Sequence, residues 1–119
     1  MLEIKGKNIY LTRGDSAYIT ITIRNQSGEL YEVQDSDELR LQVRTSPNTG
    51  KLVFEGRLIK ESKTSFVWYI RPEDTSECKI SDLYYDCQLT LSNGDVFTVI
   101  PCSKFVLKDE VTLSKKVVN

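Results

Sequence analysis

The sequence predicts an all-β protein, folded as an antiparallel sandwich of roughly seven or eight strands with at most one short helical turn. Short segments in which apolar and polar residues alternate recur along the whole chain. Turn signals built from glycine, proline, asparagine and serine separate these segments at intervals of about eight to twelve residues. Almost no segment has the helical period of apolar residues. A small barrel is the alternative architecture for the same pattern.

The predicted strands share an alternation that indicates one buried and one solvent-facing side. In chain order they occupy residues 9–12, 18–24, 39–45, 51–60, 65–71, 83–92 and 96–100, the last continued by 103–108, and a frayed edge segment at 2–5 precedes them. The clearest is 18–24, in which three isoleucines face one side and two threonines face the other. Both residue types favour strands.

The middle of the chain supplies the predicted centre of the core. A turn cluster at 46–50 and a short loop at 61–64 separate the strands there. The loop lets Leu58 approach Trp68, the only tryptophan, which we expect at the centre of the core. Residues 71–77 are the one helical candidate, because a proline suits the first helical position and acidic residues suit the first turn.

The C-terminal hairpin predicts its own register. Asn93–Gly94 is typical of a two-residue type I′ turn, because both residues accept a positive φ. A turn of this length places Leu89 opposite Thr98. It leaves Phe97 and Val99 on the outer face of the hairpin, where another segment covers them or they form a contact surface.

The three cysteines are predicted to be free, buried thiols in a reducing cytoplasm, because their number is odd and no secretory signal precedes them. The hairpin register places Cys102 opposite Tyr85, which disfavours a disulfide between Cys87 and Cys102. Cys78, the third, completes no CxxC pair, so a structural zinc site is not expected.

The composition predicts one domain at residues 1–112, followed by a short tail at 113–119. Sixteen basic and 17 acidic residues give a formal net charge of -1, so no basic excess favours nucleic acid. No apolar run approaches the roughly 20 residues of a membrane helix, and the N-terminus lacks an export signal. We expect neither a nucleic acid nor a membrane as partner.

Catalytic and cofactor-binding residues are not predicted. The chain contains no histidine, the commonest general base and metal ligand at neutral pH. Asp82 and Asp86, near Glu77, could act as a carboxylate pair, but no long loop is available to form a lid over a substrate. We therefore expect no enzyme activity, no cofactor and no metal.

Three further patterns have both a functional and a simpler interpretation. Arg13–Asp15 is the integrin-binding tripeptide, but Gly-Asp before a strand is also ordinary turn chemistry. The acidic segment 29–38 offers oxygen ligands for Ca²⁺, but it lacks the spacing of an EF-hand loop, so a solvated loop is the simpler interpretation. Arg24, Arg40 and Arg44 lie at outward positions on predicted strands. The functional interpretation is that they bind an anion, and the simpler one is that they form a solvated sheet face.

Three segments together resemble a known group of proteins. Residues 9–23 contain an Arg-Gly-Asp turn before an isoleucine and threonine strand, and residues 69–77 contain a Pro-Glu-Asp-Thr turn. Residues 84–112 read YYDCQLTLSNGDVFTVIPCSKFVLKDEVT. The chain resembles small phage and prophage proteins of Gram-positive bacteria, in particular the N-terminal domain of phage baseplate upper proteins. The resemblance implies an immunoglobulin-like sandwich that anchors receptor-binding machinery to a phage tail.

The function implied by this resemblance is that of a non-enzymatic structural or assembly protein of a phage or prophage. It would act in the virion as a tail, baseplate or fibre-attachment module, by docking to other virion proteins or to copies of itself in a homo-oligomer. The expected contact residues are Phe97 and Val99, or Ile9 and Leu11 on an exposed edge strand at 9–12.

A second hypothesis is a cytoplasmic, phage-encoded protein that binds and modulates a host protein. Small size, unpaired cysteines and the absence of a predicted export signal fit it equally well. The baseplate proteins carry a long C-terminal extension for receptor binding, whereas this sequence ends seven residues after Thr112. We therefore expect docking without a separate receptor-binding domain.

Overall fold

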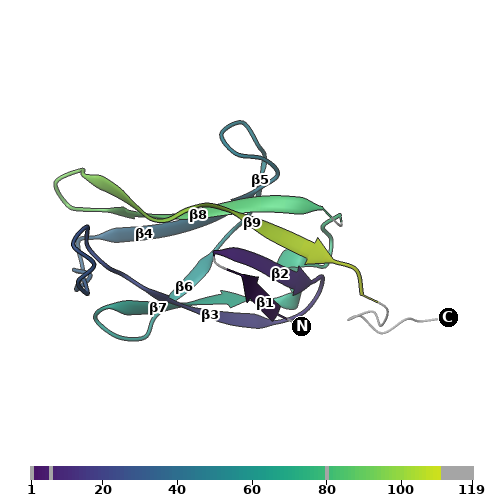
Figure 1. Ribbon diagram of the computed structural model, residues 1–119, viewed down its shortest axis with the longest axis horizontal. Coiled ribbons are helices and arrows are strands. Elements are labelled where there is room, and N and C mark those ends of the chain that lie inside the picture. The colour runs from purple at the N-terminus through teal and green to yellow at the C-terminus, as the bar shows by residue number, and fades with distance from the viewer. Residues whose placement is uncertain (1, 6, 80, 111–119) are drawn as a thin grey trace.

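The computed structural model describes residues 2–5, 7–79 and 81–110, and in this part of the chain two β-sheets pack face to face (Figure 1). The predicted all-β sandwich is confirmed. The larger sheet has six strands in the order β1-β2-β9-β8-β4-β5, and the smaller sheet has three in the order β3-β7-β6. The elements are β1 (Leu2–Lys5), β2 (Asn8–Thr12), β3 (Ala17–Thr22), β4 (Glu38–Arg44), β5 (Leu52–Glu55), β6 (Arg57–Lys60), β7 (Ser65–Ile70), α1 (Pro72–Thr75), β8 (Asp82–Thr90) and β9 (Val96–Lys108). The predicted tail at residues 113–119 lies outside the described residues.

Gly56 divides the predicted strand at residues 51–60 between the two sheets. β5 pairs with β4 in the larger sheet, and β6 pairs with β7 in the smaller sheet. The amide of Gly56 donates a hydrogen bond to the carbonyl oxygen of Leu41 at 2.7 Å, and a Cβ atom at this position would lie 2.8 Å from Leu41 Cδ2. Glycine therefore lets the chain cross between the sheets in close contact with the core. With this division and the pairing of β1, the described residues contain nine strands.

The position of β2 differs from the prediction. β2 runs parallel to β9, whereas the other strand pairs in the described ranges are antiparallel. Because β1 pairs with the opposite side of β2, the prediction of an exposed docking edge at residues 9–12 is wrong. Ile9 is 1% exposed and Leu11 is 0% exposed. Both side chains belong to the core and are not available to a partner.

Trp68 lies in the core between the two sheets, as predicted. Its side chain is fully buried, and the centroid of its ring system lies 5.4 Å from that of Tyr85 and 5.8 Å from that of Phe105. Trp68 comes from the smaller sheet and the other two rings come from the larger one, so aromatic contacts join the layers. The predicted pairing of Leu58 with Trp68 is also confirmed.

The C-terminal hairpin forms, but its turn differs from the predicted one. The amide of Gly94 donates a hydrogen bond to the carbonyl oxygen of Leu91 at 2.9 Å. The amide of Leu91 donates a hydrogen bond to the carbonyl oxygen of Asp95 at 2.8 Å. Gly94 has a φ of 93°, whereas Asn93 is not in the positive-φ region. This geometry is a three-residue loop, a type I turn followed by a left-handed glycine, and the predicted two-residue type I′ turn is wrong.

The longer loop changes the register of β8 against β9. Near the turn, Leu89 pairs with Phe97 and not with the predicted Thr98. Irregularities on either side of residue 87 shift the register again, so that Tyr85 pairs with Ser103. A bulge places an additional residue in one strand and turns the following side chains to the opposite face.

Candidate functional site

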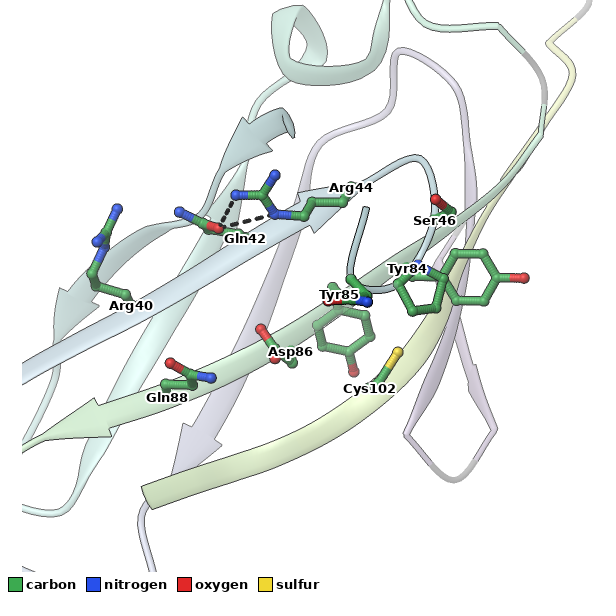
Figure 2. Close-up of a pocket in the computed structure, with 11 residues that line it drawn as sticks. Arg40, Gln42, Arg44, Ser46, Tyr84, Tyr85, Asp86, Gln88 and Cys102 are labelled. Atoms are coloured by element: carbon green, nitrogen blue, oxygen red, sulfur yellow. Dashed lines mark hydrogen bonds between the residues drawn. The ribbon is translucent and has the colours of Figure 1, made fainter. Parts of the chain in front are cut away.

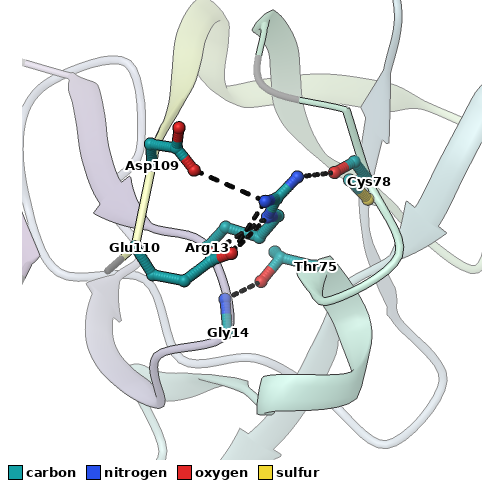
Figure 3. A network of polar contacts seen from close by, with 6 residues as sticks. All are labelled: Arg13, Gly14, Thr75, Cys78, Asp109 and Glu110. Carbon is teal, nitrogen blue, oxygen red and sulfur yellow. Dashed lines mark hydrogen bonds and ion pairs between the residues drawn. The ribbon is translucent and has the colours of Figure 1, made fainter. Parts of the chain in front are cut away.

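A polar joint lies at the end of the sandwich where the turn after β2 meets α1 and the end of β9 (Figure 3). The guanidinium of Arg13 donates to both carboxylate oxygens of Glu110, at 2.9 Å from Nε to Oε2 and 2.7 Å from Nη2 to Oε1. It also donates to the carbonyl oxygen of Cys78 at 2.9 Å and pairs with Asp109 at 3.4 Å. The joint consists of Arg13, Gly14, Thr75, Cys78, Asp109 and Glu110.

The helix α1 supplies one side of the joint. It begins at Pro72, as predicted, and the carboxylate of Asp74 accepts a hydrogen bond from the amide of Arg71 at 2.9 Å, which caps its first turn. This short helix buries Thr75 completely. The Thr75 hydroxyl oxygen then accepts a hydrogen bond from the amide of Gly14 at 2.9 Å, so the helix holds the turn after β2.

The Arg-Gly-Asp tripeptide is part of this joint. The side chain of Arg13 is 24% exposed, and its guanidinium is engaged by Glu110 and by backbone. The same hydrogen bond raises the pKa of Arg13 and lowers the pKa of Glu110. A guanidinium held in this way is not presented to a receptor, so turn chemistry accounts for the motif.

A groove of about 330 Å³ lies on the outer face of the larger sheet, where β4, β8 and β9 run side by side (Figure 2). The loop between β4 and β5 forms one wall. A Cβ atom at Gly50 would overlap the backbone of Ser46, so this loop depends on glycine. The lining residues are Arg40, Gln42, Arg44, Ser46, Pro47, Asn48, Tyr84, Tyr85, Asp86, Gln88 and Cys102.

The arginines that could recognise an anion already have acceptors within the protein. Arg44 donates to Oε1 of Gln42 at 2.8 Å and to a backbone carbonyl of the β4–β5 loop at 3.0 Å. Arg40 pairs with Glu55 at 2.8 Å. Arg24 does not line the groove. The structure therefore does not bring the three arginines together, and the groove is a mixed polar surface.

The two carboxylates considered as a catalytic pair are also separated. Asp86 lines the groove, whereas Asp82 does not. The carboxylate of Asp82 lies 3.8 Å from Nζ of Lys104 instead. The structure does not place the two carboxylates in one cleft.

Phe97 and Val99 were predicted as contact residues on the outer face of the hairpin. In the structure they lie on the core-facing side of β9. Because Phe97 pairs with Leu89, which is buried, it lies on the core side of the sheet. Phe97 is nevertheless 38% exposed near the hairpin tip, while Val99 is half-buried against the core. Val96 faces outward and is 54% exposed. The outer face of this hairpin is therefore not built by Phe97 and Val99.

All three cysteines are free. Cys87 faces the core, and burial raises its pKa to about 12. Cys102 is exposed and lines the groove on the other face of the sheet. The two sulfur atoms therefore lie on opposite faces, which is unsuited to a disulfide, as predicted. The prediction that all the thiols are buried is wrong for Cys102.

The acidic segment 29–38 is organised by hydrogen bonds to one carboxylate. Oδ2 of Asp37 accepts the hydroxyl of Tyr31 at 2.8 Å and the amide of Gln34 at 2.9 Å. The hydrogen bond from its hydroxyl to Asp37 is the main reason why the pKa of Tyr31 is raised. Within the described ranges, no three acidic or cysteine side chains gather as metal ligands.

The smaller sheet presents a surface that the sequence analysis did not identify. Tyr18 on β3 is 65% exposed, and its ring stacks on that of Tyr69 on β7 with centroids 4.7 Å apart and planes at 8°. Ile59 on β6 is also exposed. Among the described strands, β3 has a neighbour on one side only. The absence of any charged residue from Ala17 to Thr22 is the sequence signal for this edge.

Comparison with protein-family models and curated proteins does not identify a relative. The sequence matches no model of a protein family, and no curated protein matches it. In the residues that the structure describes, no helix has the length and apolar character needed to cross a membrane.

Proposed function

We propose that the protein is a non-enzymatic docking module of a phage or prophage particle, such as a tail, baseplate or fibre-attachment component. The proposal rests on one observation: the three segments that resemble phage proteins, 9–23, 69–77 and 84–112, meet in the polar joint. Arg13 of segment 9–23 bonds to Glu110 of segment 84–112. The amide of Gly14 bonds to Thr75 in the remaining segment. The motif residues thus hold one another in the joint.

The joint supports a docking role because it fixes the end of β9 against distant parts of the chain. Arg13 and Glu110 are 97 residues apart in the sequence. Paired charge-assisted hydrogen bonds between guanidinium and carboxylate are strong and directional. They set the direction of the chain at Glu110 relative to the sandwich. A rigid arrangement of this kind suits a module that holds a neighbour at a fixed orientation.

The immunoglobulin-like part of the proposal is supported by strand order and by one tyrosine. In that fold, a sheet of strands G, F and C, extended by C′ in variable-type domains, faces a sheet that contains B, E and D. The orders β9-β8-β4-β5 and β3-β7-β6 match these two sheets. Tyr85 stands two residues before Cys87 and donates its hydroxyl hydrogen to the carbonyl oxygen of Lys7. The place of this tyrosine in the strand resembles the tyrosine corner of immunoglobulin domains, although the hydroxyl of that corner bonds to backbone only a few residues upstream.

The proposal is tested by purifying phage particles from an induced lysogen that produces the tagged protein. We expect the tagged protein to co-purify with the particles at a constant ratio, while an unrelated tagged cytoplasmic protein is absent. Arg13→Ala is expected to reduce incorporation, because it removes the joint. Arg40→Ala, which removes an exposed arginine outside the joint, is the matched control and is expected to be incorporated normally.

Absence of the wild-type protein from purified particles would contradict a structural role. A cytoplasmic pull-down that then recovers one host protein in stoichiometric amount would support the alternative, a phage-encoded protein that binds and modulates a host protein.

A further inference from the structure

We propose that β3 pairs with β3 of a second copy of this chain, antiparallel about a two-fold axis at Thr20, so that the two smaller sheets join into one. This inference names a partner for the docking module and rests on the proposed function for its biological role. Pairing between strand edges is a common way to join proteins, because the main chain at an edge carries hydrogen-bonding groups without a strand partner.

Among the edges of the two described sheets, only β3 lacks a feature that blocks such pairing. It pairs with β7 on one side and has no hydrogen-bonded strand on the other in the described part of the chain. Its residues, Ala17–Thr22, include no charged residue and no proline, and its register with β7 is regular. Natural edge strands are usually protected by charges, prolines, bulges or short length.

The other three edges carry such protection. β6 begins with Arg57 and ends with Lys60. β5 has four residues, ends with Glu55 and pairs with β4 in an irregular register. β1 also has four residues, and its sequence includes Glu3 and Lys5. The open edge is therefore a property of β3 and not of the fold in general.

Isoleucines flank Thr20 on both sides, so the strand is self-complementary at its centre, which favours a second copy as the partner. Antiparallel pairing about this residue places Thr20 opposite its own copy. Ile19 then faces Ile21 of the second copy on the core side of the strand. Tyr18 faces Thr22 on the outer side. Pairs of β-branched and aromatic residues stabilise antiparallel strands, and no like charges meet in this register.

The size of the contact predicts weak association. Thr20 is exposed on the outer face, next to the stacked rings of Tyr18 and Tyr69. One strand of six residues from each copy forms a much smaller interface than the roughly 1,600 Å² of a standard stable complex. We therefore expect self-association that depends on protein concentration and that is strengthened when several contacts act together in an assembly.

Charged substitutions at the two-fold axis test this pairing. In Thr20→Lys, two ammonium groups face each other, and in Thr20→Glu two carboxylates do so. Sedimentation velocity over about a hundredfold range of protein concentration measures self-association, and each variant alone is expected to associate at least about tenfold more weakly than the wild type. An equimolar mixture of the two variants is expected to recover association. Thr98→Lys, at an exposed position of β9, is the matched control and is expected to associate like the wild type.

A wild type that stays monomeric at every concentration, or self-association that Thr20→Lys leaves unchanged, would overturn the inference. The fluorescence of the buried Trp68 verifies that each variant is folded. Incorporation into phage particles is measured separately. Protein that self-associates but stays out of particles contradicts the proposed function alone. Protein that enters particles without self-associating contradicts this inference alone.

Discussion

The three cysteines have different reactivities because the fold places them in three environments. Alkylation is expected to modify the exposed Cys102 first, Cys78 more slowly, and Cys87 only after unfolding. The thiolate is the reactive form, and burial raises the pKa of Cys78 and raises that of Cys87 to about 12. Timed alkylation followed by peptide mass spectrometry measures this order. Rapid modification of Cys87 in the native protein would contradict its buried position.

Gly56 is a second residue whose effect follows from its surroundings. We expect Gly56→Ala to lower the free energy of unfolding by about 1–3 kcal/mol, because the new Cβ atom would overlap the packed side chain of Leu41. Urea unfolding of the variant measures this loss.

The overlap with Leu41 is tested by combining two substitutions. Leu41→Ala removes Cδ2 and Cγ, two of the three Leu41 atoms that a Cβ at position 56 would meet, including the nearest one. The double variant is therefore expected to be less destabilised than the sum of the two single variants, with a coupling of about 0.5 kcal/mol or more. Simple additivity would show that the cost of Gly56→Ala has another origin.

At the scale of elements, the three-residue β8–β9 loop predicts unequal roles for Asn93 and Gly94. Gly94 has a φ of 93°, so Gly94→Ala is expected to cost about 1–2 kcal/mol of stability. Asn93→Ala is expected to cost about 0.5 kcal/mol, because it removes only two exposed hydrogen bonds, one from the amide of Asp95 and one to its carboxylate. Thermal unfolding of both variants measures the difference. Large and equal losses would instead indicate the two-residue type I′ turn, in which both residues have a positive φ.

The joint predicts a contribution to stability that depends on pH. The hydrogen bond from Arg13 lowers the pKa of Glu110 below its ordinary value of 4.5. Such a carboxyl stabilises the fold above its unfolded pKa, and this stabilisation is lost as pH falls through the lower folded pKa. Glu110→Gln is therefore expected to be less stable than the wild type at about pH 7 and equally stable in strong acid. Urea midpoints across this range measure the difference.

The matched control for this effect is Asp109→Asn. Asp109 is 76% exposed and lies 3.4 Å from the guanidinium of Arg13, so its removal is expected to have a smaller effect on the urea midpoint. A difference between wild type and Glu110→Gln that stays constant with pH would contradict the role of the Glu110 charge.

Across the whole molecule, local sequence patterns predicted the strands better than their arrangement. Alternation identified β3, β4 and β8, because one face of each strand lies against the core. The parallel pairing of β2 with β9 joins residues that lie far apart in the sequence. No local pattern carries that information, and this is why Ile9 and Leu11 were wrongly expected at an exposed edge. The crossing at Gly56 depends in the same way on contact with a distant residue, Leu41.

The candidate site was harder to predict than the fold. A one-residue difference in the length of the hairpin loop was enough to move Phe97 to the other face of β9. The residues of the joint were visible as motifs, but the sequence did not indicate that Arg13 bonds to Glu110. The open edge of β3 had a local sequence signal, the absence of charged residues. That signal could be interpreted only once the structure placed β3 at the edge of the described sheet.

The two sheets are expected to unfold as one unit, because neither has a core of its own. Trp68 of the smaller sheet packs against Tyr85 and Phe105 of the larger sheet, so separation of the layers exposes the same apolar surface on both. Tryptophan fluorescence reports only on Trp68, while far-ultraviolet circular dichroism reports on the strands of both sheets. We expect their urea transitions to coincide, as in a two-state domain. Two separate transitions would show that one sheet persists without the other, and would contradict a shared core.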